Sequence, residues 1–361
     1  MQVTLTMNCT HDPTSHLRNL DPGFMTYYLG AFALLTAVNV GGNSLVLLTI
    51  RRHRSMWTPI NGFICSLALS DLLLAVIYPT YNVAGIDVES VTSVLGQITV
   101  CRILQTESIA LELCSSYALV AITVTRYLSI ARPLRYHNDV TPRRCIVIVV
   151  TLWVASHTAC IILYWYKEPE KTYCNICRYE ILFSMTQLGV LTSVQSGVPL
   201  CLMIVVYVRL AQIARQLKKR VAICDVTMNF ETGTIHCRQP TSHRRHRSFV
   251  MITLLLGCYV IAWTPIIVYF FLVILGNYDR NQMEYFSATS RIVLYMNSAV
   301  NVFIYAGRMG DFRKHVRRDL RNLLPNCCAS RKTSQRDDIM IASTVVGMTT
   351  RQNSSWGVRN Q

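Results

Sequence analysis

Charged side chains are scarce in this chain, because Asp, Glu, Lys and Arg together make up 15% of its 361 residues. Hydrophobic residues make up 52%. A soluble protein does not need so much apolar sequence to build its core, so the composition favours a membrane protein. Acidic residues are the scarcer kind, 19 against 35 Lys and Arg, which leaves a formal net charge of +16.

The chain also lacks the patterns that indicate catalysis. No nucleophile paired with a base, no metal-binding cluster and no phosphate-binding loop stands out, and this disfavours an enzyme. The first thirty residues do not show a basic start followed by a short apolar core. We therefore expect no cleavable signal peptide, and we expect the first apolar stretch to direct membrane insertion.

Long hydrophobic runs, in contrast, are abundant. A helix needs about twenty apolar residues to cross a bilayer, and seven stretches reach that length: Met25–Ile50, Ile60–Tyr81, Val100–Ser129, Ile146–Tyr166, Ile181–Tyr207, Phe249–Leu275 and Tyr285–Ala306. Seven crossings place the two termini on opposite sides of the membrane.

The basic residues gather in alternate loops. They follow the first, third and fifth stretches, at Arg51, Arg52, Arg54, Arg132, Arg135, Arg143, Arg144, Arg215, Lys218, Lys219, Arg220, Arg244, Arg245 and Arg247. By the positive-inside rule, the N-terminus is extracellular and the C-terminus cytoplasmic. The excess positive charge then indicates contact with membrane lipids or a cytosolic partner, and no nucleic acid.

Polar motifs recur at the ends and centres of these apolar stretches. They are Gly42-Asn43, Leu67-Ala68-Leu69-Ser70-Asp71, Thr125-Arg126-Tyr127, Trp263-Thr264-Pro265 and Asn301-Val302-Phe303-Ile304-Tyr305. Together they resemble the rhodopsin-like, or class A, family of G-protein-coupled receptors. The resemblance implies an all-α membrane protein, a seven-transmembrane helix bundle with a short C-terminal amphipathic helix. It also implies a plasma-membrane receptor that converts an extracellular ligand into heterotrimeric G-protein activation.

The domain organisation follows from this assignment. We expect an extracellular tail over 1–24, the receptor domain over 25–306, an amphipathic helix over 307–328 and a disordered cytoplasmic tail over 329–361. The polar segment Val221–Ser242 is expected to be a flexible inner loop. Ser and Thr residues in the tail imply phosphorylation by a receptor kinase and arrestin binding.

The resemblance assigns roles to polar residues within the spans. Asp71, Ser115, Asn297, Ser298 and Asn301 match the family's hydrated sodium pocket, and their oxygens suit a small cation. The other reading is a water-filled hydrogen-bond network joining the first, second and seventh spans. No other cofactor is implied. The activation switch corresponds to Arg126, Tyr207, Tyr259, Trp263, Pro265, Asn301 and Tyr305.

The ligand is less well specified. Ser108, Glu112, Trp263, Phe270, Arg291 and Tyr295 are candidate ligand-binding residues. Glu112 could face a cationic group and Arg291 an anionic one, or the two could pair with each other. Ser108 stands where amine receptors have an aspartate, which argues against a monoamine, and Tyr295 stands where an opsin holds its retinal. A small molecule, a lipid or a short peptide remains open.

Local segments narrow the subgroup. Leu134-Arg135-Tyr136-His137-Asn138, Thr141-Pro142-Arg143-Arg144 and Trp153-Val154-Ala155 resemble the second inner loop and fourth span of melanocortin receptors, and less closely those of adenosine receptors. The calcium-binding acids of melanocortin receptors are absent at Cys101 and Gln105, and Phe270 replaces the asparagine that contacts adenosine.

Covalent modifications are predicted outside the spans. Asn8-Cys9-Thr10 is a glycosylation sequon on the outer face. The resemblance implies that Cys101 pairs with one of Cys174 and Cys177, and the sequence does not choose between them. Cys327 and Cys328 are candidate palmitoylation sites after the amphipathic segment.

Three positions depart from the family pattern. Thr125 stands where an acid usually precedes the arginine, Arg245 stands where many members have an acid at the foot of the sixth span, and Val302 replaces a proline. The first two predict raised basal signalling. The third predicts a smaller kink and keeps open a non-coupling receptor-like protein. A seven-helix transporter, channel or scramblase that uses Asp71 and Glu112 is the rival from another class, although no inverted repeat supports it.

Overall fold

The computed structural model describes residues 21–84, 94–165, 185–231, 241–275 and 280–323, and these residues contain helices and no strands. The chain divides into two compact units, Met1–Met309 and Gly310–Gln361. The predicted modifications at Asn8, Cys174, Cys177, Cys327 and Cys328 lie outside the described residues. The side chains of Cys101 and Arg245 also lie outside them.

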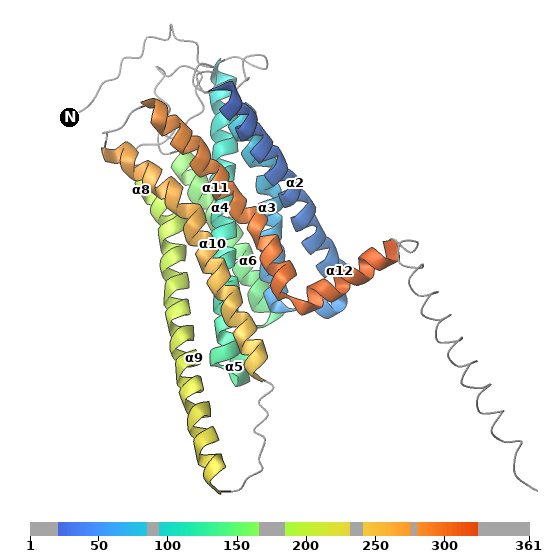
Figure 1. Cartoon of the computed structure of the whole chain (residues 1–361). Helices are drawn as coiled ribbons and strands as arrows, with labels where there is room; N and C mark the ends of the chain where they lie inside the picture. Colours follow the sequence, from blue (N-terminus) through green and yellow to red (C-terminus); the bar gives the residue numbers. More distant parts are fainter. Residues whose placement is uncertain (1–20, 85–93, 166–184, 232–240, 276–279, 324–361) are drawn as a thin grey trace, which may run out of the picture. The chain divides into compact units, whose positions relative to one another are not determined.

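The first unit holds the long helices in chain order (Figure 1). They are α2 (Pro22–Arg52), α3 (Pro59–Ala84), α4 (Val94–Ala131), α6 (Pro142–Trp165), α9 (Val198–Glu231), α10 (Thr241–Leu275) and α11 (Arg280–Arg308). Shorter helical pieces are the 3-10 turn η1 (Arg54–Met56), α5 (Pro133–Asp139), α8 (Met185–Thr192) and the π-helical turn η3 (Ser193–Gly197).

Local sequence explains where several helices begin. Helix α2 starts with Pro22 after Asp21, whose carboxylate accepts a hydrogen bond from the backbone N–H of Phe24 at 3.2 Å. Helix α6 starts with Pro142 after Thr141, whose hydroxyl accepts from the N–H of Arg144 at 3.3 Å. Proline suits the first helical position because it has no N–H to leave unsatisfied there.

Helix α4 forms the centre of the bundle. It packs against α3, α6, α9 and α10, and α2 packs against both α3 and α11. In an 18-residue apolar window within Ile103–Ala131 of α4, 83% is buried inside the protein, whereas in the corresponding window of Pro142–Ile162 in α6 only 17% is buried. Side chains on α4 therefore have neighbours on nearly every side, while most of α6 presents apolar surface outward.

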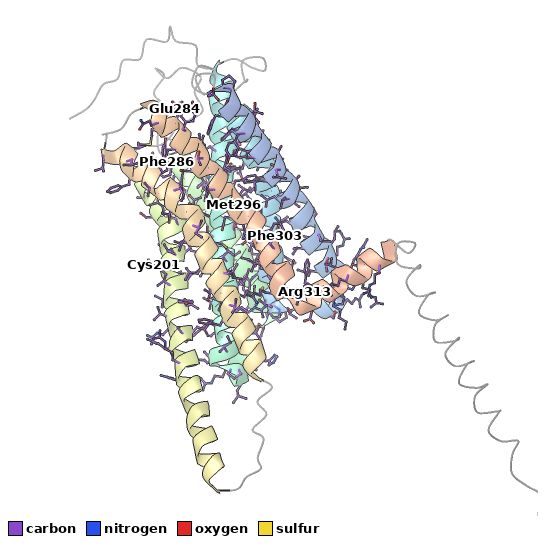
Figure 2. The ribbon with its side chains drawn as sticks, in the orientation of Figure 1. Cys201, Glu284, Phe286, Met296, Phe303 and Arg313 are labelled. Carbon is purple, nitrogen blue, oxygen red and sulfur yellow. The ribbon has the colours of Figure 1, made fainter. Side chains whose placement is uncertain are left out.

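Six helices in the described part of the chain are long and apolar enough to cross a membrane. The seventh long helix, α11, is more polar, and its polar side faces inward: Ser287, Ser290, Ser298 and Asn301 are buried. Met296 and Phe303 lie on the outer side of the same helix (Figure 2). Since α11 also packs along α2 and α10, the predicted seven-helix bundle is confirmed.

Helices α2 and α11 approach each other closely at Gly42. A Cβ atom on Gly42 would lie 2.8 Å from one γ-carbon of Val302 and 2.9 Å from the other. Val302 is buried, and α11 continues as an α-helix on both sides of it. The valine that stands in place of proline therefore fills the space that the missing side chain of Gly42 leaves open.

The fifth crossing consists of α8, η3 and α9. Its π-helical turn was not predicted, and neither was its length. Helix α9 continues to Glu231 and α10 begins at Thr241, so much of the segment Val221–Ser242 is helical. The prediction of a flexible loop there was wrong for these residues, because polar composition alone does not prevent a helix from extending.

The second unit contains α12 (Gly310–Leu323) within its described residues. Asp311 lies in its first turn and Arg321 in its last, both favourable for the helix dipole. Phe312 and Val316 are four residues apart and so share one face of an otherwise strongly basic helix. This is the amphipathic helix that the sequence predicted.

Candidate functional site

A fully buried carboxylate, that of Asp71 on α3, organises the middle of the bundle. Its Oδ1 atom accepts hydrogen bonds from the hydroxyls of Ser115 on α4 and Ser298 on α11, both at 2.9 Å. Its Oδ2 atom accepts from the side-chain amide of Asn301 at 3.0 Å. Three helices thus meet on one acid, and four of the five residues predicted for the sodium pocket lie together.

Asn297, the fifth, is half-buried on α11 and forms no hydrogen bond with Asp71. Beside this cluster, Asn43 donates its side-chain amide to Asn39 at 3.3 Å on α2. Among the described residues, the Nδ2 atom of Asn39 and the Oδ1 atom of Asn43 are buried without a partner. Such a site is polar enough to hold bound water.

Stacked aromatic rings lie next to the cluster. The ring of Tyr295 stacks on Tyr78 and Phe32, with centroids 5.2 and 5.4 Å apart. The Tyr295 hydroxyl lies 3.0 Å from that of Thr36. Tyr295, which was predicted to bind ligand, is therefore buried in the aromatic contact between α2, α3 and α11.

A cavity lies in the half of the bundle where α11 begins and α10 ends. Its empty volume is about 550 Å³, including its opening. Four of the six predicted ligand-binding residues line it: Glu112, Trp263, Phe270 and Arg291. Ser108 and Tyr295 do not line it, and the Ser108 hydroxyl instead donates to the carbonyl of Leu104 in its own helix at 2.8 Å.

Nine further residues of the lining were not predicted. They are Tyr78, Ile109, Leu191, Thr192, Gln195, Ile266, Tyr269, Ser287 and Leu294. Helical spacing could have found most of them, because Ile109 lies one turn from Glu112, Ile266 one turn from Trp263, and Ser287 and Leu294 lie on either side of Arg291. Gln195 could not have been found this way, because it belongs to the π-helical turn.

Glu112 and Gln195 meet on the wall of this cavity. The side-chain amide of Gln195 donates to the Oε2 atom of Glu112, and both side chains are buried. The predicted alternative, a pair between Glu112 and Arg291, does not occur. Arg291 instead interacts with the hydroxyl of Tyr28 on α2. Trp263, which also lines the cavity, buries its indole N–H without a hydrogen-bond partner in the described structure.

The π-helical turn before α9 is held by two tyrosines from other helices. Tyr117 on α4 donates its hydroxyl to the carbonyl of Val194 at 3.0 Å. Tyr259 on α10 donates to the carbonyl of Gln195 at 3.0 Å. An N–H at position 199 would serve the carbonyl of residue 194 in a π-helix or of residue 195 in an α-helix. Position 199 is a proline, so the N–H that would bond to one of these carbonyls is missing, and both carbonyls accept hydrogen bonds from tyrosines of other helices.

The other end of the bundle contains the remaining switch residues. The hydroxyl of Thr125 donates to the carbonyl of Ala121 at 2.7 Å, within its own helix. Tyr207 and Phe249 stack across α9 and α10 with centroids 5.6 Å apart. The Tyr305 hydroxyl is buried without a hydrogen bond among the described residues, within electrostatic range of Arg126. Pro265, in contrast, lies inside α10 at the cavity end, between the lining residues Trp263 and Ile266, and its position in a helix is as its motif predicted.

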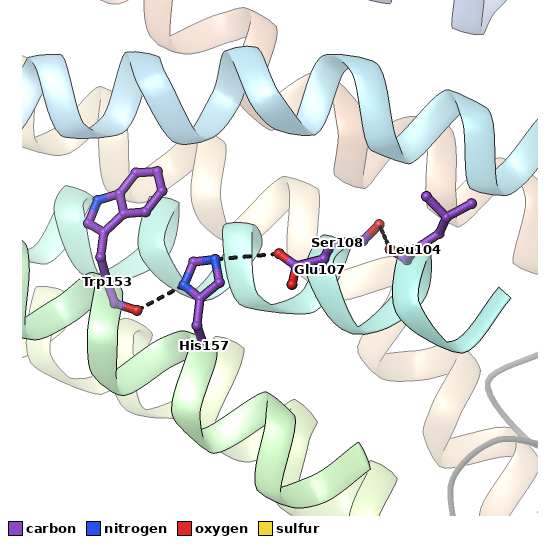
Figure 3. A network of polar contacts seen from close by, with 5 residues as sticks. All are labelled: Leu104, Glu107, Ser108, Trp153 and His157. Carbon is purple, nitrogen blue, oxygen red and sulfur yellow. Dashed lines mark hydrogen bonds and ion pairs between the residues drawn. The ribbon is translucent and has the colours of Figure 1, made fainter. Parts of the chain in front are cut away.

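A second acidic group lies between α4 and α6. Glu107 and His157 approach to 3.5 Å through Oε2 and Nε2, and the Nδ1 atom of His157 lies 2.8 Å from the carbonyl of Trp153 (Figure 3). A carbonyl only accepts, so Nδ1 holds a proton. The pair is partly exposed, at 29% and 39%, on the outside of the bundle.

Comparison with known proteins gives a consistent result. A family model described as 7 transmembrane receptor (rhodopsin family) matches residues 42–305. Melanocortin receptor 4 of Danio rerio is 29% identical over 301 residues, covering 78% of this chain and 80% of the relative. Human melanocortin receptor 5 is 28% identical over 298 residues, covering 78% and 81%. The human histamine H2 receptor is 28% identical over 289 residues, covering 78% and 76%.

Proposed function

The chain belongs to the rhodopsin family of seven-transmembrane receptors, and on that premise we propose that it binds an extracellular ligand in the cavity lined by Glu112, Gln195, Trp263 and Arg291. It is a multi-pass plasma-membrane receptor whose partners are a heterotrimeric G protein and an extracellular ligand, and it is not an enzyme. Its orientation follows the alternation of basic loops, with the N-terminus extracellular.

One observation supports this site above the others. The cavity brings together a buried acid, a buried indole N–H and four aromatic side chains within one open pocket. Ligand sites in proteins are mostly apolar concave surfaces with a few convergent polar groups. The names of the relatives point to different ligands, so no single ligand is transferred to this chain.

The contacts of Thr125 favour a receptor with raised basal signalling. Its hydroxyl bonds to its own helix, so it offers Arg126 no negative charge. A receptor whose arginine lacks an adjacent acid holds its inactive state with fewer charge-assisted hydrogen bonds. The active conformation is then more populated without ligand.

The Asp71 cluster supports a bound sodium ion. Two serine hydroxyls lie 2.9 Å from the same carboxylate oxygen, and hydroxyls can turn their lone pairs toward a cation. One carboxylate with two hydroxyl oxygens and water would provide a hard-oxygen ligand set. Sodium would then raise the melting temperature of the purified receptor relative to an equal concentration of a large organic cation, and Asp71→Asn would abolish the difference.

Arrestin and a receptor kinase complete the proposed partners. Their expected contact is the serine- and threonine-rich tail, to which phosphate would add negative charge. Substituting the tail's Ser and Thr residues by Ala would remove arrestin recruitment while leaving G-protein activation intact.

The experiment that tests the proposed function is ligand-free G-protein activation in cells, measured across the main G-protein classes. The chain is compared with Arg126→Ala at matched surface expression, with Arg308→Ala as a control for the loss of one positive charge. Signal that Arg126→Ala removes and Arg308→Ala keeps supports the proposal. Equal signal in all three chains contradicts the proposed role of Arg126.

A further inference from the structure

Two side chains of opposite charge, Glu112 and Arg291, line the cavity, and each has a different partner in the protein. Arg291 interacts with the Tyr28 hydroxyl. Glu112 is 7% exposed and its one partner among the described residues is the neutral amide of Gln195. The wall of the cavity therefore holds an acid that has no cation beside it.

This arrangement is costly for the free receptor. A buried carboxylate loses much of its hydration, and one amide hydrogen bond compensates only part of that loss. A ligand cation would supply the missing charge partner. The aromatic side chains Tyr78, Trp263, Tyr269 and Phe270 line the same cavity, and aromatic faces attract cations as well.

We propose that the ligand carries an ammonium or guanidinium group that binds Glu112 and displaces the side-chain amide of Gln195. This inference rests on the receptor function proposed above and names the chemical class of its ligand. Gln195 acts as a positioning residue, because its side-chain amide donates to the Glu112 carboxylate only until the ligand binds there.

The position of the acid limits the shape of the ligand. Ser108 and Glu112 are four residues apart on α4, which is about 6 Å along a helix. An acid at Glu112 therefore lies one turn further from the start of α4 than an acid at position 108 would. The ligand must present its positive group at the end of an arm and not on a broad surface.

When the ligand replaces Gln195 at Glu112, the change can also affect another helix of the bundle. The backbone carbonyl of Gln195 accepts the hydroxyl of Tyr259 on α10, and the rings of Tyr259 and Trp263 lie 5.8 Å apart. Displacement of the Gln195 side chain thus acts on a residue whose backbone is joined to α10.

The test measures the electrostatic potential in the cavity without requiring the natural ligand. Thr192 is half-buried and lines the cavity, so Thr192→Cys introduces a reporter thiol there. Its rate of modification is measured with methanethiosulfonates that carry a trimethylammonium, a sulfonate or a neutral hydroxyl group. The same full-length chain without Thr192→Cys gives the background from native cysteines.

The expected result is faster reaction with the cationic reagent than with the anionic one. Adding Glu112→Gln lowers the ratio of the two rates on the order of tenfold, since the acid on the wall of the same cavity is removed in a medium of reduced dielectric constant. Adding Glu107→Gln leaves the ratio unchanged, because Glu107 is outside the cavity lining. Adding Gln195→Leu also lowers the ratio, since the carboxylate loses the amide hydrogen bond that stabilises its charged form, and this variant serves if Glu112→Gln does not fold.

A ratio that favours the anionic reagent in the parent chain would show that Arg291 dominates the cavity and would overturn the inference. An unchanged ratio in Glu112→Gln together with Gln195→Leu would overturn it too. The Arg126-dependent G-protein signal is recorded in the same cells. If that signal persists while the cationic preference is absent, the receptor function stands and only the ligand class is wrong.

Discussion

The π-helical turn before α9 makes a prediction that depends on counting hydrogen bonds. The carbonyl of Val194 accepts a hydrogen bond from the hydroxyl of Tyr117, and the carbonyl of Gln195 accepts one from the hydroxyl of Tyr259. Pro199 offers no N–H to either. Tyr259→Phe therefore leaves the Gln195 carbonyl unserved and also removes a weak 3.4 Å contact with Ser116.

The cost follows from the environment of that carbonyl. An unserved buried polar group costs about 1–3 kcal/mol, while side-chain hydrogen bonds between membrane helices average about 0.6 kcal/mol and reach about 1.7 kcal/mol. We expect Tyr259→Phe to destabilise the receptor by about 1 kcal/mol, and this lowers the apparent melting temperature by about 2–4 °C. Tyr27→Phe is the control, because Tyr27 is 57% exposed and should change nothing.

Pro199→Ala provides the decisive background for this experiment. It restores one N–H, which can serve the carbonyl of residue 194 or that of residue 195, but not both well. Tyr259→Phe or Tyr117→Phe alone should then cost little in that background, while the two together should cost about as much as one does in the parent chain. Equal costs with and without Pro199→Ala, measured by thermal unfolding of the purified receptor, would refute the reasoning.

Two further predictions come from other contacts. Gly42→Ala should destabilise the receptor by about 1–3 kcal/mol, because its methyl group would clash with Val302; in a Val302→Ala background most of that cost should disappear in thermal unfolding. Thr125→Asp should lower ligand-free G-protein signalling, and an unchanged signal at equal surface expression would count against raised basal activity.

The sequence predicted the bundle because each crossing leaves a strong local signal. Seven apolar stretches and their polar motifs indicated seven helices. The resemblance to rhodopsin-like receptors implied that Asp71 groups with Ser115, Asn297, Ser298 and Asn301, and all of these except Asn297 form hydrogen bonds with it. Helix α11 is less apolar than the other six, so its hydrophobicity is a weaker signal for a crossing. The motif that begins at Asn301 identified it as the seventh helix. The extent of α9 was not predictable, because the polar segment after Val221 has no apolar period.

The ligand cavity was only partly predictable, because its lining depends on how neighbouring helices are rotated. Glu112 and Arg291 were predicted to bind ligand because they are charged residues inside apolar stretches, and both line the cavity. Their mutual pairing was a reasonable alternative on charge alone. Glu112 instead accepts a hydrogen bond from Gln195. Gln195 lies in the π-helical turn, and no periodic pattern in the sequence predicts such a turn.

The same irregular turn explains why Glu112, Tyr117 and Tyr259 belong to one functional unit. A regular helix satisfies its own carbonyls and so can rotate or slide without breaking bonds to its neighbours. A π-helical turn followed by proline cannot, since its carbonyls of residues 194 and 195 take their hydrogens from α4 and α10. Any displacement of Gln195 from Glu112 must therefore be accommodated where three helices are already joined by hydrogen bonds. The energy of two such bonds is about the size of the coupling energies found between sites in allosteric proteins, about 1–3 kcal/mol. The cavity and α10 are thus linked through the irregular turn, and a ligand that displaced Gln195 would act directly on that link.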